Sequence, residues 1–287
     1  MGRHPWLAPQ DQASPLGDLA FLRHSYGVRD YLADSFGQGI VATVHVEALW
    51  DRARDPVEET MWLDTLPLEN GIALRCVAFA PLASPDAPAL IEAQAANPRV
   101  AGLRETIRWH PDPARRWTEE GITDDPAWRR GLAYLDRHGL LLELLMNPFQ
   151  AEAVARLAAD FPNQRLVVNH CCTPLDRDVE GLARWQQGLT LLGSVPNVWI
   201  KLSNFVAYTD DRTAAGARAV LMPCIEAFGV DRCLWGSDYP VARRTLPFAA
   251  MCDLFREAIR PFSPSEQRRL LHDNAAGLYG LPQGDAA

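Results

Sequence analysis

The sequence contains no stretch that could cross a membrane, since no apolar run reaches the ~18 residues that a spanning helix needs. Its first ten residues also lack the apolar core of a secretory signal peptide. Positive charge is in deficit: the formal net charge is -8 and the pI is about 5.4, which argues against a nucleic-acid partner. We therefore expect a cytoplasmic protein that acts on a small molecule, with no nucleic-acid and no membrane partner.

Several motifs are absent as well. No Gly-rich phosphate loop follows the first expected strand, and the pattern Gly-x-x-x-x-Gly-Lys does not occur. This weighs against a doubly wound open sheet, the main rival of a barrel for an alternating α/β sequence. The six cysteines form no Cys-x-x-Cys pair, so we expect buried thiols in a reducing compartment rather than disulfides or zinc ligands.

What the sequence does contain is a regular alternation of strands and helices. Its 287 residues, 48% of them apolar, suit one α/β-barrel domain spanning residues 1–287. Seven β-rich runs are expected as strands of a parallel sheet. They begin near residues 40, 72, 100, 140, 165, 198 and 233. A closed barrel has eight strands, so a gap is expected between the strands near Ile40 and Cys233 unless residues 1–27 fill it.

Helices are expected between and after these strands. Their ranges are 28–36, 56–70, 87–96, 126–138, 148–161, 179–195, 214–228, 248–259 and 264–272. Asp125 and Pro126 supply a helix cap followed by a first-turn proline. The charged loop 112–125 is most simply a solvated surface, although it could also form a lid.

The run Cys233–Val241 is the strongest candidate for an active-site strand end. It begins as an apolar strand, turns at Gly236 and stops at Pro240, which places the carboxylate of Asp238 just past the strand. In an α/β barrel such positions face the active site. Burial raises a carboxyl pKa, so Asp238 could serve as a general base. The alternative is that Asp238 only caps the following turn.

Two histidines and a lysine lie on or at the ends of other strands. His170 ends a strand and is either a site residue or a satisfied polar group. His45 is expected on the same strand face as Glu47, but the sequence does not say whether that face is the barrel interior. Lys201 either lines the barrel or extends along its surface from a strand edge.

Arginine and amide side chains complete the candidate set. Arg104 sits inside a strand, where an unpaired charge would be costly. It could bind a substrate carboxylate or carbonyl, or it could form a buried ion pair with Glu47, Glu105 or Glu143. Asn147 and His110, together with Arg108, lie on or just after strand ends and are weaker candidates for substrate selection.

Taken together, these segments resemble a known family. The resemblance rests on Thr43–Ala48, Gly102–Arg104 with Trp109–Asp112, Val168–His170, Ile200–Ser203 and Trp235–Pro240. They are similar to the amidohydrolase-2 family, and more closely to its lactonase branch of pyrone-dicarboxylate hydrolases and sugar lactonases. The resemblance implies a distorted (β/α)8 TIM barrel that hydrolyses lactones or amides, with Asp238 and His170 catalytic. Some relatives decarboxylate aromatic acids, and an inactive truncated barrel is a further alternative.

One departure from the family pattern concerns metal. The family begins with a strand ending in His-x-His, and this sequence has no His-x-His. Only His170 and Asp238 match family ligand positions, fewer than the three protein ligands usual for catalytic zinc. We therefore expect no tightly bound zinc or manganese unless the native protein starts upstream of Met1 and supplies that motif. An open sheet edge also predicts self-association as a homo-oligomer.

Overall fold

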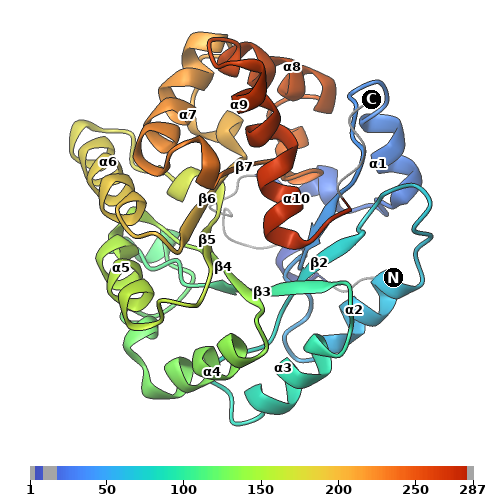
Figure 1. Cartoon of the computed structure of the whole chain (residues 1–287), viewed down its shortest axis with the longest axis vertical. Helices are drawn as coiled ribbons and strands as arrows, with labels where there is room; N and C mark the ends of the chain where they lie inside the picture. The colour runs from blue at the N-terminus through green and yellow to red at the C-terminus, as the bar shows by residue number, and fades with distance from the viewer. Residues whose placement is uncertain (1–3, 9–17, 283–287) are drawn as a thin grey trace.

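The computed structural model describes residues 4–8 and 18–282, and at its centre lies a parallel sheet of seven strands (Figure 1). The strands pair strictly in sequence order, each with the next. They are β1 Val44–Val46, β2 Arg75–Ala78, β3 Val100–Thr106, β4 Leu141–Leu145, β5 Leu166–Val168, β6 Val198–Ser203 and β7 Cys233–Gly236. This confirms the predicted distorted barrel and its seven strands.

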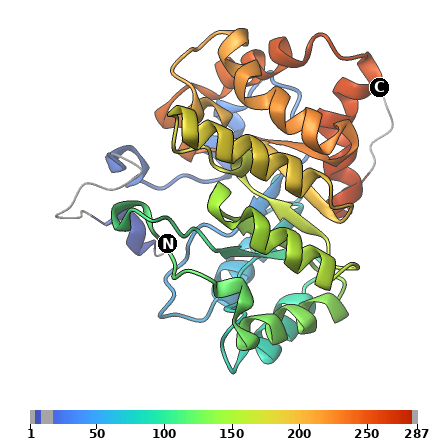
Figure 2. The ribbon, with the colours of Figure 1, turned by 90° about the vertical axis from the view of Figure 1, so that its left-hand side faces the viewer.

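Helices cover the outer face of the curled sheet. They are α1 Val28–Asp34, α2 Val57–Asp64, α3 Ala87–Ala95, α4 Pro126–Arg137, α5 Ala151–Asp160, α6 Val179–Gly193, α7 Ala214–Phe228, α8 Phe248–Ile259, α9 Pro264–Arg268 and α10 Asn274–Tyr279. Neighbouring helices pack side by side, as α5, α6 and α7 do in Figure 2. Within residues 4–8 and 18–282, no helix is long and apolar enough to cross a membrane.

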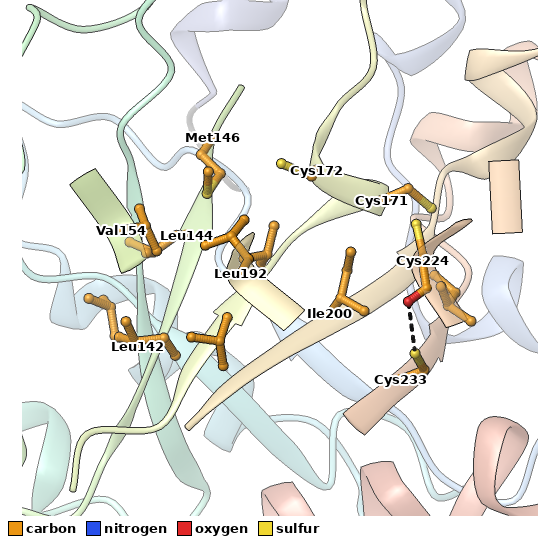
Figure 3. Packing of buried hydrophobic residues seen from close by; sticks show 14 of the residues in the cluster. Leu142, Leu144, Met146, Val154, Cys171, Cys172, Leu192, Ile200, Cys224 and Cys233 are labelled. Carbon is orange, nitrogen blue, oxygen red and sulfur yellow. Dashed lines mark hydrogen bonds between the residues drawn. The ribbon is translucent and has the colours of Figure 1, made fainter. Parts of the chain in front are cut away.

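The core forms because each strand is apolar on its helix-facing side. Leu142, Leu144 and Ile200 are fully buried there and pack against helix residues such as Val154 and Leu192 (Figure 3). All six cysteines are buried free thiols, as expected. The other side of each strand faces the barrel interior. Because side chains alternate along a strand, every second residue points inward.

The two end strands of the sheet, β1 and β7, mark an opening in the barrel. Within the described residues they do not pair with each other. The strand predicted from Ile40 is shorter in the structure, where β1 spans only Val44–Val46. Residues 40–43 form no ladder with β2; they contribute a single backbone bond, from the Thr43 N–H to the Gly71 carbonyl at 2.9 Å.

The helix α10 closes the amino-terminal end of the barrel. Its Leu278 and Tyr279 pack against Val77, Leu141 and Val167, which point inward from β2, β4 and β5. A barrel of this kind holds its site at the carboxyl ends of the strands, and α10 lines the same cavity through Ala275, Ala276 and Tyr279.

Candidate active site

A cavity of about 1090 Å³ occupies the carboxyl ends of the strands and continues around the free edge of β1. Residues on both faces of β1 line it, together with part of α2 and the segment before α1. The predicted residues Arg104, His170, Lys201 and Asp238 lie along one wall. His45 lines it too, whereas Asn147 and His110 lie elsewhere, along a much smaller cavity.

Asp238 and His170 lie next to each other in this cavity. Each lies two residues beyond its strand, Asp238 after β7 and His170 after β5. His170 Nε2 is 3.7 Å from Asp238 Oδ1, and His170 Nδ1 is 2.8 Å from the hydroxyl of Ser203, the last residue of β6. Three strand ends thus converge on one small volume.

The backbone at both residues has a left-handed conformation, which is uncommon for residues other than glycine. Asp238 and His170 each have a φ of 52°. Cys171, Cys172 and Thr173 continue the left-handed turn after His170, and the Trp185 indole N–H, 2.7 Å from the Cys171 carbonyl, holds it in place. Such strain persists only where surrounding contacts fix it, and it occurs often at functional sites.

Burial tunes the protonation of both groups. It raises the pKa of Asp238 from 3.8 to about 7, against the opposing effect of Arg104, Lys201 and Arg244. Burial, with the charges of Arg104 and Lys201, holds the pKa of His170 well below its ordinary value. At neutral pH the histidine is therefore neutral, while Asp238 sits near its midpoint, where it can both accept and donate a proton.

Lys201 is the only lysine in the sequence, and it is held by a buried glutamate. Its Nζ lies 2.6 and 2.7 Å from the two carboxylate oxygens of Glu143. The Tyr279 hydroxyl and the Asn169 amide also donate to Glu143, at 2.7 and 2.8 Å. Burial opposes ionisation of Glu143, but Lys201 and these two donors keep its pKa below the ordinary value.

Arg104 is paired rather than free. Its Nε donates to Glu47 Oε1 at 2.9 Å, and one terminal nitrogen donates to the Glu47 carbonyl. Of the three glutamates that could have paired with it, the structure selects Glu47. The guanidinium still lines the cavity, so substrate contact through its remaining nitrogen stays a proposal.

His45 lies on the face of β1 opposite to Val44 and Val46, which pack in the barrel interior. Its Nε2 is 3.0 Å from Glu59 Oε1 of α2. The expectation that His45 and Glu47 share a face is wrong, because strand alternation holds only within the strand and β1 ends at Val46. His45 reaches the cavity only where it passes around the edge of β1.

His110 and Asn147 belong to a neighbouring polar cluster. His110 lies 3.3 Å from Asp176, which also pairs with Arg115 and Arg184. Asn147 donates to the Trp109 carbonyl at 3.0 Å. Both lie beside the strand ends, as predicted, but away from the wall that holds Asp238.

Sequence reasoning gave no role to two residues that shape the site. Ser203 alternates with Lys201 along β6, so its inward direction was available from the pattern. Tyr279 sits on the last helix, and nothing in its local sequence indicates that its hydroxyl reaches Glu143 on β4.

The side chains around Asp238 supply few donors for a metal ion. Within the part of the protein that the structure describes, no group of three or more His, Cys, Asp or Glu side chains is arranged to hold a metal ion. His170 and Asp238 alone do not make a tight zinc site, which usually takes at least three protein ligands. We therefore derive no chemical step through a metal.

Comparison with known proteins agrees with this architecture. The profile of the amidohydrolase family matches residues 1–281. The chain belongs to the amidohydrolase family. The resemblance inferred from its motifs is thereby confirmed, and the protein is an amidohydrolase-family hydrolase.

The similar proteins include lactonases. The chain is 31% identical to the uncharacterized protein y4mH of Sinorhizobium fredii, over 96% of this chain and 93% of that protein. It is 27% identical to the L-fucono-1,5-lactonase of Burkholderia ambifaria, over 99% and 96% of the two sequences. A crystal structure of an amidohydrolase from Burkholderia multivorans with bound zinc superimposes with a TM-score of 0.77 and 26% identity, covering 92% of each protein.

Proposed function

We propose that this amidohydrolase opens a small lactone by hydrolysis, with Asp238 as general base. The observation that carries the proposal is the Asp238 carboxyl group, buried at a strand end, with its pKa raised to about 7 and His170 3.7 Å away. The lactonase activity of relatives 27% identical over nearly the whole sequence supports the same reaction.

The first step is attack of water on the ring carbonyl. Ionised Asp238 takes a proton from that water as the oxygen bonds to the carbonyl carbon. Lys201 and Arg104, whose charges act on Asp238, lie on the same wall and stabilise the oxyanion that develops. Protonated Asp238 then delivers the proton to the ring oxygen as the C–O bond breaks, which restores the carboxylate and releases the ring-opened acid.

His170 has a supporting role in this scheme. When the Ser203 hydroxyl donates to Nδ1, the neutral imidazole carries its proton on Nε2, the nitrogen that faces Asp238. That N–H donates to the substrate carbonyl and polarises it. The low pKa of His170 keeps it from exchanging protons with Asp238, so the two residues keep separate roles.

The test is the pH dependence of lactone opening. With L-fucono-1,5-lactone and D-glucono-1,5-lactone as probes, kcat/KM of the native protein rises with pH and reaches half its plateau near the pKa of Asp238, about 7. The Asp238→Asn variant, which keeps shape but cannot accept the proton, loses this rise. A native pH profile that is flat between pH 5 and 8 contradicts the proposal.

Metal content is measured on the same preparation. Elemental analysis after dialysis against a chelator is expected to find no stoichiometric zinc or manganese, because His170 and Asp238 are too few ligands. Tightly held metal would show that the ligand set extends beyond the residues described, and it would reassign Asp238.

A further inference from the structure

The one lysine of this chain lies in the cavity, although the chain otherwise uses arginine for its permanent positive charges. Of the 28 lysine and arginine residues, Lys201 is the only lysine. Three arginines, Arg23, Arg104 and Arg256, line the same cavity. A position that needed only a positive charge would be served by arginine as well. An amine differs in its chemistry, because it becomes a nucleophile when it loses its proton, whereas a guanidinium stays protonated in proteins.

The amine of Lys201 is within reach of a small molecule in the cavity. Its side chain points inward from β6, as does that of Ser203, which contacts His170. The Lys201 side chain is 11% exposed and lines the cavity. Its Nζ lies 5.5 Å from the centre of the Tyr279 ring, which lines the cavity beside it. The amine is therefore largely shielded from bulk water and still open to a ligand.

Glu143 is placed to take a proton from this amine. Its two carboxylate oxygens lie 2.6 and 2.7 Å from Nζ, and the residue is fully buried. Burial lowers the pKa of Lys201 below its ordinary value, although the charge of Glu143 opposes that shift. Lysines in such desolvated positions act as nucleophiles, because the proton is lost more easily than in water.

The ion pair itself selects the kind of ligand that Lys201 can bind covalently. An aldehyde that condenses with the amine leaves an iminium ion, whose positive charge keeps Glu143 paired. Acylation of the same nitrogen would produce a neutral amide and leave Glu143 buried without its counter-ion, which is strongly destabilising. The buried carboxylate therefore favours a carbonyl compound that forms an iminium over an acyl donor.

We propose that Lys201 is a covalent binding site for small aldehydes, which it captures as a protonated imine. Glu143 takes a proton from the ammonium group, the nitrogen bonds to the carbonyl carbon, and the carbonyl oxygen receives that proton to give a carbinolamine. Glu143 then moves a second proton from nitrogen to the hydroxyl group, the C–O bond breaks, and water leaves as the nitrogen electron pair forms the C=N bond. Glu143 ends as a carboxylate beside the iminium, and no oxidant or reductant is consumed. This binding goes beyond the proposed lactone hydrolysis and does not depend on it.

Reductive trapping of the native protein tests the proposal. Sodium cyanoborohydride converts an imine formed with glycolaldehyde into a stable secondary amine, which adds the mass of the aldehyde less one oxygen atom. Peptide mass mapping distinguishes Lys201 from the terminal α-amine, the only other aliphatic amine of the chain. At pH 7 we expect trapping at Lys201 to be at least about tenfold faster in the folded protein than in guanidinium chloride, where the amine has its ordinary pKa. The folded rate should also level off as the glycolaldehyde concentration rises.

Lys201→Arg is the matched control, because it keeps a positive charge beside Glu143 and removes the only side-chain amine. Trapping in this variant should be confined to the terminal α-amine. Trapping at Lys201 that is no faster in the folded than in the unfolded native protein overturns the proposal, and so does labelling of the α-amine alone. If Lys201→Arg does not fold, the comparison of folded with unfolded native protein decides by itself. None of these measurements uses a lactone, so a protein that opens no lactone can still confirm or overturn the aldehyde site.

Discussion

Asp238 and Glu105 are both buried carboxyl groups, and burial raises the pKa of each to about 7. They stand on opposite sides of the sheet. Asp238 lines the cavity, near Arg104 and Lys201. Glu105 alternates with Arg104 on β3 and points toward the helices, where Oε1 accepts the Leu82 N–H at 2.9 Å. A raised pKa is therefore not by itself a mark of catalysis; access to a cavity and a facing proton partner make the difference.

The largest expected effect is a difference in kcat between variants of Asp238 and of Glu105. Asp238→Asn should lower kcat on an opened lactone by at least about a hundredfold, the usual range for loss of a general base. Glu105→Gln should retain native turnover, because it changes a carboxyl with a similarly raised pKa that lies outside the cavity. Steady-state kinetics at pH 8 compares them, and an equal loss in both variants would mean that the raised pKa acts through stability alone.

The second prediction concerns the ion pair of Lys201 with Glu143, which lies near Asp238. Lys201→Met leaves Glu143 buried without its counter-ion and should lower the free energy of unfolding by about 3–5 kcal/mol. Lys201→Met with Glu143→Gln removes both charges and should recover part of that loss. Urea unfolding at pH 7 measures both variants. If the double variant is less stable than the single one, the ion pair is not the source of the effect.

The third prediction uses the pH dependence of stability. Glu105 has a folded pKa of about 7 against an ordinary value of 4.5, so its contribution is present below pH 4.5 and is lost as pH rises through 7. At pH 8, Glu105→Gln should raise the free energy of unfolding by up to about 3 kcal/mol. Below about pH 4 native and variant should converge. A constant difference at both pH values would point to packing instead.

The smallest expected effect is the pH dependence of stability that arises from Asp238. Asp238→Asn should also stabilise the protein at pH 8, by about 1–2 kcal/mol, because an ionised carboxylate is buried there too. The gain is smaller than for Glu105 because the Asp238 side chain is 18% exposed and cations lie nearby. Thermal unfolding at pH 5 and pH 8 measures it. If Asp238→Asn is destabilised at both pH values, the residue is a structural cap, and the mechanism above is wrong.

The sequence alone determined the order of elements, because periodicity and caps act over a few residues. The predicted ranges 214–228 and 248–259 coincide with α7 and α8. The seven strands lie where their apolar runs predicted them. The sequence left open whether Lys201 lines the barrel, and the structure places it inward beside Glu143. Position after a strand was enough to single out Asp238 and His170.

Only the tertiary structure decided which charges meet. Arg104 had three possible glutamate partners, and the fold of β1, β2 and β3 selected Glu47, the one farthest from it in sequence. The contact of Tyr279 with Glu143 joins residues 136 positions apart, and no local pattern encodes such a distance. His45 turned to α2 because β1 ended one residue before Glu47. Pairing and exposure of buried charges depend on long-range packing, which a local sequence pattern does not encode.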